Sequence, residues 1–281
     1  MRGKKVTLVL LIIFFVGLSI LLYPMVSQYL NSKVQSKAID DYEKKFSNIS
    51  SDDYKKMFEE AKKYNKELLK LDYPLAQYNI LTGYNDILNL NDNGMIGYVS
   101  IEKIKVELPI YHGTSSAVLN VAAGHMEGSS LPVGGESTHS IISAHRGLPS
   151  SRLFTDLDKM ELGDTFTITV LNQTLTYQVD KIEVIEPKEV KSLEIIEGED
   201  YVTLLTCTPY GINTHRLLVR GKRIENVNKK KLYVTYEAYK VDRFIVTIAI
   251  ALPIFSFVKR AHVLVPSPFI CMETTGRPCW S

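Results

Sequence analysis

The chain has 281 residues, of which 45% are hydrophobic and 23% are charged, and its formal net charge is +2. This composition excludes a disordered, collagen-like or disulfide-dense chain, and the small net charge gives no basic excess for binding nucleic acid. Two of the three cysteines, Cys271 and Cys279, lie near the C-terminus. Cys207 is therefore alone in the rest of the sequence and needs either a packing role or a chemical one.

An uncharged run covers residues 6–26 and follows the basic residues Arg2, Lys4 and Lys5. A run of this length can cross a bilayer as a helix, and the basic flank predicts a cytoplasmic N-terminus. The run does not end in the small residues of a signal-peptidase site, so an uncleaved anchor is preferred to a signal peptide. We predict that residues 1–31 are a cytoplasmic N-terminus and a transmembrane anchor.

A second apolar run covers residues 244–258 and contains Pro253. It is short for a membrane span, but the flanking basic residues favour a second transmembrane segment over its alternative, a buried core helix. Residues 227–281 are thus predicted to be a linker, this segment and an atypical tail. Cys271 and Cys279 alone are too few ligands for a metal site.

Between the two apolar runs, the spacing of apolar residues predicts a helical part followed by a β part. Residues 32–93 carry apolar side chains at helical spacing over 34–42 and 54–68, and Ser50 and Ser51 precede the second helix as capping residues. From Gly97 onward the period is two, which is typical of strands. Strands are expected at 99–101, 104–110, 140–143, 166–170, 175–179, 182–184, 201–207 and 217–219, and one short helix at 153–160. Many short strands and few helices favour a closed β-barrel over residues 94–226.

Cys207 ends an alternating run, residues 201–206, and precedes a turn that contains Pro209 and Gly211. A thiol at a strand end can meet a substrate, whereas a thiol inside a strand usually serves packing. Arg216 begins the next run, so antiparallel pairing of the two strands would bring it back beside Cys207. A guanidinium there favours the thiolate and supplies donors for an oxyanion.

Cysteine catalysis also needs a general acid or base, usually a histidine. His145 follows an apolar run and begins a loop, so it is the first candidate. His139 lies about 20 Å away along an extended strand, so both cannot serve one thiol. His112 and His125 are expected on the surface. Spacing alone leaves the partner of Cys207 open.

Several motifs, in order, decide the choice. Residues 203–207 read TLLTC, which resembles the Thr-Leu-x-Thr-Cys signature of sortases, the cysteine transpeptidases of Gram-positive cell surfaces. The resemblance is to the class C, pilin-polymerising branch and covers roughly residues 94–225. Further matching stretches are HRGLP at 145–149, LFTDL at 153–157, TCTPYG at 206–211, HRL at 215–217, LPIYHG at 108–113 and LPVGG at 131–135.

The resemblance implies a sortase-type barrel of about eight strands, with Cys207 as nucleophile, His145 as general acid and base, and Arg216 as oxyanion stabiliser. It implies cleavage of an LPXTG-like sorting signal between Thr and Gly and transfer to a pilin lysine, on the outer face of a Gram-positive membrane. The partners are then proteins that bear the signal and an amine acceptor on a pilin or the cell wall. Neither a cofactor nor a metal is predicted.

Class C sortases usually carry a lid with an Asp-Pro-aromatic motif in front of the barrel. Here residues 71–74 read LDYP, with the aromatic residue and the proline exchanged. Asp72, as a partner of Arg216, and Tyr73, as a cover for Cys207, are the candidate lid residues, with an ordinary turn as the alternative.

Other functions stay open on sequence alone. A housekeeping sortase that anchors proteins to the cell wall would use the same three residues. A secreted cysteine hydrolase would use the same thiol and imidazole and would differ only in the acceptor. A non-catalytic, membrane-anchored binding module would need Cys207 only for structure. Against that module, the thiol, the imidazole and the guanidinium are all expected at strand ends, where packing needs them least.

Overall fold

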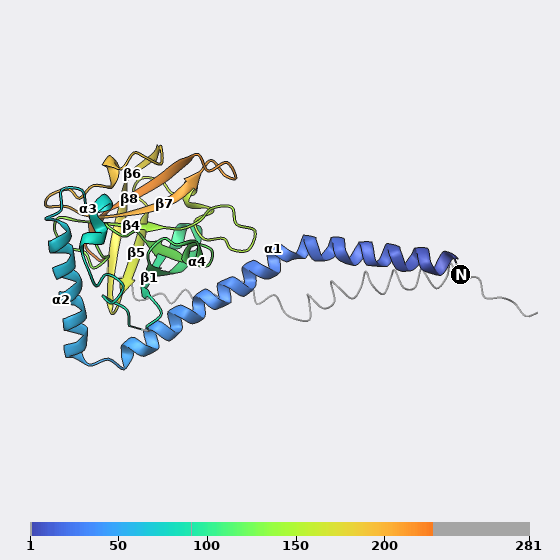
Figure 1. The fold of residues 1–281 in the computed structure, drawn as a ribbon, viewed down its shortest axis with the longest axis horizontal. Coiled ribbons are helices and arrows are strands. Elements are labelled where there is room, and N and C mark those ends of the chain that lie inside the picture. The colour runs from blue at the N-terminus through green and yellow to red at the C-terminus, as the bar shows by residue number, and fades with distance from the viewer. Residues whose placement is uncertain (1, 91, 227–281) are drawn as a thin grey trace, which may run out of the picture. The chain divides into compact units, whose positions relative to one another are not determined.

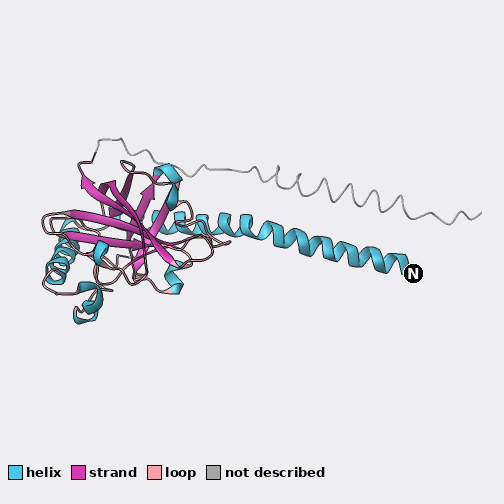
Figure 2. Cartoon of the chain, turned by 90° about the horizontal axis from the view of Figure 1, so that it is seen from above, coloured by secondary structure: helices cyan, strands magenta, loops and turns pink. Residues whose placement is uncertain are grey.

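The computed structural model describes residues 2–90 and 92–226. In this part of the chain, eight strands close into a barrel, as expected from the sequence (Figures 1 and 2). Their order around the barrel is β1-β2-β3-β4-β7-β8-β6-β5. Neighbouring strands are antiparallel except for the pairs β2–β3 and β4–β7, which are parallel. The strands are β1 (Met95–Ile101), β2 (Val106–His112), β3 (Ala123–His125), β4 (Thr138–Ser143), β5 (Thr165–Val170), β6 (Gln173–Ile185), β7 (Asp200–Thr208) and β8 (His215–Ile224).

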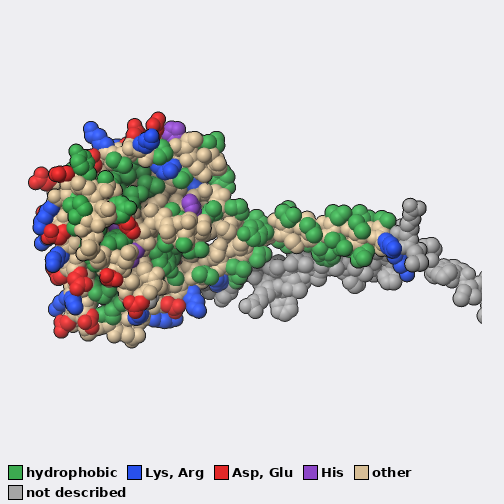
Figure 3. All heavy atoms as spheres, viewed as in Figure 1, with side chains coloured by type: hydrophobic (Ala, Val, Ile, Leu, Met, Phe, Trp, Pro, Cys, Tyr) green, Lys and Arg blue, Asp and Glu red, His purple; other side chains and the backbone are tan. Residues whose placement is uncertain are grey.

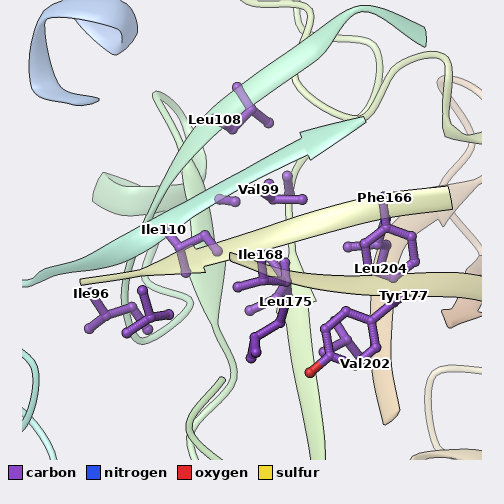
Figure 4. Close-up of a cluster of buried hydrophobic side chains, with 14 of the residues drawn as sticks. Ile96, Val99, Leu108, Ile110, Phe166, Ile168, Leu175, Tyr177, Val202 and Leu204 are labelled. Carbon is purple, nitrogen blue, oxygen red and sulfur yellow. The ribbon is translucent and has the colours of Figure 1, made fainter. Parts of the chain in front are cut away.

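The barrel interior is filled by the inward-facing residues of these strands (Figure 4). The period of two in the sequence produces this core because successive side chains of a strand point to opposite faces. Val99, Ile110 and Ile168 are each 0% exposed and meet inside the barrel. Burial of such side chains contributes about 1.5–3 kcal/mol each.

The strands expected at 166–170 and 175–179 are joined in a tight hairpin of β5 and β6. Val170 pairs with Gln173, so the two-residue loop is Leu171–Asn172, and Leu171 has a φ of 52°. The expected short strand at 182–184 is the second half of β6, and pairing with β8 is irregular between Val179 and Lys181. One long strand therefore replaces the two expected.

Two helices precede the barrel, α1 (Arg2–Ser47) and α2 (Ser51–Leu68). Ser50 caps α2: its hydroxyl oxygen accepts from the backbone N–H of Asp53 at 3.1 Å. The helix expected over 34–42 is the continuation of the apolar N-terminal run, so α1 is one element. Tyr42 joins it to the barrel, because its hydroxyl donates to the carbonyl of Ile96 and accepts from the N–H of Leu171, both at 2.9 Å.

The N-terminal part of α1 is long and apolar enough to cross a membrane, and its most apolar window is 0% buried. Hydrophobic side chains cover its visible surface (Figure 3). Core helices of soluble proteins are mostly buried, so this exposure sets α1 apart from them. The second apolar run, residues 244–258, and the tail that follows lie outside the described residues.

The prediction of a short α-helix at 153–160 is wrong. The segment consists of turns and the 3-10 helix η3 (Leu157–Lys159), and Leu153 has a φ of 38°. Leu153, Phe154, Leu157 and Met160 are nevertheless all buried. The helical spacing therefore identified which side chains enter the core but not the backbone that carries them.

Candidate active site

Cys207 and Arg216 are paired directly across the antiparallel ladder of β7 and β8. The antiparallel arrangement expected from the sequence is thus confirmed. In an antiparallel pair, directly opposed residues point to the same face with their Cβ atoms about 5 Å apart. Both residues are partly exposed, whereas the preceding residues of β7, Val202 to Thr206, are buried. The thiol and the guanidinium therefore share one face of the sheet, near the end of β7 and the start of β8.

His145 lies on the other side of Cys207, just beyond the end of β4. Strands β4 and β7 are parallel, and Ser143 is the partner of Leu205. The ladder continues one step further, because the N–H of Ala144 donates to the carbonyl of Leu205 at 3.1 Å. Two residues beyond Ser143 and Leu205, this register brings His145 level with Cys207. Continued in this way, the register places His145, which follows β4, beside the pair formed by Cys207 of β7 and Arg216 of β8.

A buried hydroxyl fixes this register. Thr206 is 1% exposed, and its Oγ1 donates to the carbonyl oxygen of Ala144 at 2.8 Å. The bond joins the residue before Cys207 to the residue before His145. Sequence reasoning did not assign this role to Thr206, although Thr206 belongs to the motif that was recognised.

The loop after His145 closes back on it. The N–H of Phe154 donates to the carbonyl of His145 at 3.1 Å, and the N–H of Gly147 donates to Oγ1 of Thr155 at 3.3 Å. Gly147 has a φ of 81°, and a Cβ there would come within 3.1 Å of the Tyr210 ring. The loop between β7 and β8 therefore packs on the loop that begins at His145.

The guanidinium of Arg216 is oriented by its own loop. Within the described part of the chain its hydrogen bonds all come from Nη1, which donates to the carbonyls of Asn213 at 3.2 Å and His215 at 3.0 Å. An arginine has five N–H donors, so others remain to face a ligand.

An apolar cluster continues the face that carries Cys207. It consists of Ile141, Ile185, Leu193, Leu205 and Leu218, with Leu75 and Met126 packed against it. We call the first five residues the outer cluster. Leu205 and Leu218 are paired and lie two residues from Cys207 and Arg216, on the same face and about 7 Å along the strands. The outer cluster is thus a buried apolar group next to the thiol, partly covered by Leu75 and Met126.

The candidate lid residues Asp72 and Tyr73 directly precede a short helix. Asp72 forms no ion pair with Arg216 in residues 2–90 and 92–226, and Tyr73 is 72% exposed. The helix α3 (Pro74–Gln77) follows them and lies against Gly128, where a Cβ would come within 2.6 Å of the Pro74 carbonyl oxygen. Leu75 of α3 is the residue of this segment that packs on the outer cluster.

Two of the remaining histidines are structural. His125 is 0% exposed; its Nε2 donates to the carbonyl of Ser130 and its Nδ1 accepts from the hydroxyl of Tyr84, both at 2.8 Å. His139 is bonded in the same way: its Nδ1 donates to the carbonyl of Glu194 at 2.8 Å, and its Nε2 accepts from the hydroxyl of Thr203 at 2.7 Å. Burial lowers the pKa of each ring from 6.5 to about 4, so both are neutral. The expectation that His125 lies on the surface was wrong.

His112 was also expected on the surface and is half-buried. It ends β2 and packs edge-on against Tyr84 with ring centroids 4.8 Å apart. Its Nδ1 lies 3.0 Å from the carbonyl oxygen of Gly94, within hydrogen-bond distance. Nearby glycines suggested loops for His112 and His125, but both occupy strand ends. Among the described residues, no group of three His, Cys, Asp or Glu side chains is placed to hold a metal ion.

Comparisons of sequence agree with this geometry. A sequence model of the sortase domain matches residues 99–224. Sortase A of Streptococcus agalactiae serotype III (strain NEM316) is 28% identical over 131 residues, 46% of this chain and 52% of that protein. Sortase D of Bacillus subtilis (strain 168) is 27% identical over 131 residues, 46% of this chain and 63% of that protein. The matches thus span between half and two thirds of these relatives.

Solved structures cover more of the chain. Sortase C1 from Streptococcus agalactiae is 50% identical with a TM-score of 0.62, and the match covers 68% of this chain and 100% of the sortase C1 chain. Sortase C of Streptococcus pneumoniae is 45% identical with a TM-score of 0.59, over 67% of this chain and 96% of that one. The chain therefore belongs to the sortase family of cysteine transpeptidases, in its class C branch.

Proposed function

We propose that this chain is a membrane-anchored sortase that cleaves an LPXTG-like sorting signal between Thr and Gly and transfers the acyl group to a lysine amine of a pilin. The observation that carries the proposal is the pairing of Cys207 with Arg216 across β7 and β8, with His145 two residues beyond the β4 end of the β4–β7 ladder. These three groups are a nucleophile, a proton carrier and a donor for an oxyanion, which acyl transfer through a thioester requires.

In the first half of the reaction, the Cys207 thiolate attacks the carbonyl carbon of the threonine and forms a C–S bond. The negative charge moves to the carbonyl oxygen, where N–H donors of Arg216 stabilise it. His145 gives a proton to the nitrogen of the glycine as the C–N bond breaks. The C-terminal fragment leaves, and a thioester remains on Cys207.

In the second half, a lysine amine attacks the thioester carbon. His145 accepts the proton of the amine, the C–S bond breaks, and the Cys207 thiolate is restored. The product is an isopeptide bond. Water in place of the amine would give a free acid, so the identity of the acceptor separates transpeptidation from hydrolysis.

The outer cluster supports recognition of the apolar start of the signal. A peptide that lies along β7 with its threonine at Cys207 would bring its leucine and proline over Leu205 and Leu218. Leu75 occupies that surface here, so α3 acts as a cover that substrate displaces. A lid is also named for the S. agalactiae sortase C1, and that likeness supports this role. Asp72 and Tyr73 remain predictions as lid residues.

A pilin acceptor is favoured over a cell-wall acceptor by the closeness of the relatives. The chain is 45% identical to the S. pneumoniae sortase C, which has pilin substrates, and 28% identical to the S. agalactiae sortase A. The exposed apolar stretch of α1 supports an anchor in the membrane of a bacterial surface enzyme, with the barrel outside.

The test is to incubate the full chain with LPXTG-like peptides and a pilin or an amine, and to follow intact mass. A thioester on wild-type protein, absent from Cys207→Ala, and an amine-joined product are expected. Cleavage to free acid with a pilin present would make the protein a hydrolase. No thioester in the wild type or in Leu75→Ala would favour a binding module.

A further inference from the structure

Three amide side chains of α1 bind the loop that begins at the active site. Nδ2 of Asn31 donates to the carbonyl of Ser150 at 2.7 Å, and Nε2 of Gln28 donates to that of Pro149 at 3.3 Å. Nε2 of Gln35 donates to the carbonyl of Val121 at 2.7 Å and to the hydroxyl of Ser151 at 3.3 Å. Spacings of three and four residues put these amides on one face of the helix. We call Gln28, Asn31 and Gln35 the amide strip.

The amide strip contacts the part of the loop that lies away from its base at His145 and Phe154. The loop from His145 to Phe154 is closed at its base by the bond between the Phe154 N–H and the His145 carbonyl. Its far end, Pro149–Ser151, is held by the strip, and Ser151 is only 2% exposed although it is a loop serine. Gln35 is 9% exposed. The buried hydroxyl of Ser151 and the half-buried carbonyl of Ser150 thus both receive their donors from α1.

The strip is also close to the apolar stretch of α1. At 1.5 Å per residue, Gln28 lies about 3 Å, Asn31 about 7 Å and Gln35 about 14 Å beyond Val26, the last residue of the uncharged run. The headgroup layer on each side of a bilayer is about 5–8 Å thick. With α1 spanning a membrane, Gln28 and Asn31 lie at headgroup level, and the loop they bind lies there too.

We infer that the amide strip is a positioning device that fixes the His145 loop to the membrane anchor and thereby holds the imidazole in place at the membrane surface. None of the three amides reaches the reacting atoms; they act through Pro149–Ser151. The inference rests on the proposed function only for its effect on catalysis. The docking of the loop on α1 stands independently.

The decisive variants are Asn31→Ala with Gln35→Ala, and Asn31→Asp, which keeps the shape of the side chain but replaces the donor by an acceptor. Lys37→Ala, an exposed position on the same helix, is the matched control. The full chain is measured in lipid nanodiscs. Hydrogen exchange of the 146–153 amides should become faster by about fivefold for each bond lost, the worth of a net hydrogen bond.

The catalytic readout separates positioning from general stability. In the double variant we expect kcat per folded molecule for acyl-enzyme formation to fall severalfold with KM unchanged, whatever the change in the thermal midpoint. Asn31→Gln, which retains the donor, should recover part of the loss. A structural role alone would lower the thermal midpoint and leave kcat per folded molecule unchanged, and that result would overturn the inference.

Two further outcomes are decisive. Unchanged exchange of the loop in the double variant would show that α1 does not hold it. Faster exchange with unchanged kcat would show that the strip holds the loop without positioning His145, which also overturns the inference. If wild-type protein forms no acyl-enzyme, the proposed function fails, while the exchange measurement still decides whether the strip holds the loop.

Discussion

The hydroxyl of Thr206 and the carbonyl of Ala144 form a buried hydrogen bond of 2.8 Å that joins β7, which carries Cys207, to the segment after β4 that carries His145. Each partner is the immediate chain neighbour of a candidate catalytic residue. The inner face of β7 therefore sets the geometry of its outer face, because Thr206 points into the barrel while Cys207 points out of it.

Replacing Thr206 by valine keeps its shape and removes this bond. The Ala144 carbonyl is then buried without a donor, at a cost of about 1–3 kcal/mol. We expect a lower free energy of unfolding and a lower kcat, measured by urea titration and by acyl-enzyme formation. Thr167→Val on β5 is the matched control. An unchanged kcat in folded Thr206→Val would show that the bond does not position the site.

Arg216→Gln removes the guanidinium while leaving the β7–β8 ladder intact. Loss of the oxyanion donor should slow thioester formation by about 10²–10³-fold. Lys222→Gln removes the same charge further along β8 and is the control. Equal rates in the two variants would remove Arg216 from the mechanism.

Leu75→Ala should uncover the outer cluster. The substitution removes up to about 2 kcal/mol of apolar contact and favours the open position of α3, so acyl-enzyme formation should become severalfold faster. Tyr73→Ala is the comparison, since Tyr73 is 72% exposed. Faster reaction in Tyr73→Ala but not in Leu75→Ala would restore the lid residue expected from the sequence.

The two structural histidines predict a loss of stability in mild acid. Their pKa values in the fold are about 4, below the ordinary 6.5, so the unfolded chain takes up protons first as the pH falls. The stabilisation is complete above pH 6.5 and is lost as the pH falls toward 4, by up to about 3 kcal/mol for each ring.

Urea unfolding between pH 8 and pH 4 measures this slope. His139→Gln should flatten it, because that side chain no longer titrates, while His215→Gln at the partly exposed start of β8 should leave it unchanged. A free energy of unfolding that does not vary over this range would contradict the neutral, buried state of His125 and His139.

The sequence predicted the barrel because alternation of apolar residues survives in most strands. It also contained an unused signal for the outer cluster. Ile141–Ile142, Leu204–Leu205 and Leu217–Leu218 are adjacent apolar pairs, which mean that both faces of a strand are covered. One member of each pair enters the barrel and the other joins the outer cluster.

Other features depend on tertiary contacts that spacing cannot reveal. Leu153 adopts a positive φ because the loop closes on His145, so a helical spacing of apolar residues ends in turns. His125 is buried because Tyr84 and Ser130 satisfy both ring nitrogens, and neither partner is identifiable from neighbouring residues. The pairing of Cys207 with Arg216, in contrast, follows from a single turn and could be predicted.

The continuity of α1 has a mechanical consequence. Helix α1 runs from Arg2 to Ser47 without a break, and Tyr42 bonds it to β1 and to the β5–β6 turn. The apolar stretch is therefore joined to the barrel by continuous helix rather than by a flexible linker. Pro24 lies inside this helix and lacks the N–H that the helical ladder requires. With its apolar stretch in a membrane, α1 would bend most readily at Pro24, and the angle there would set the orientation of the barrel relative to the membrane.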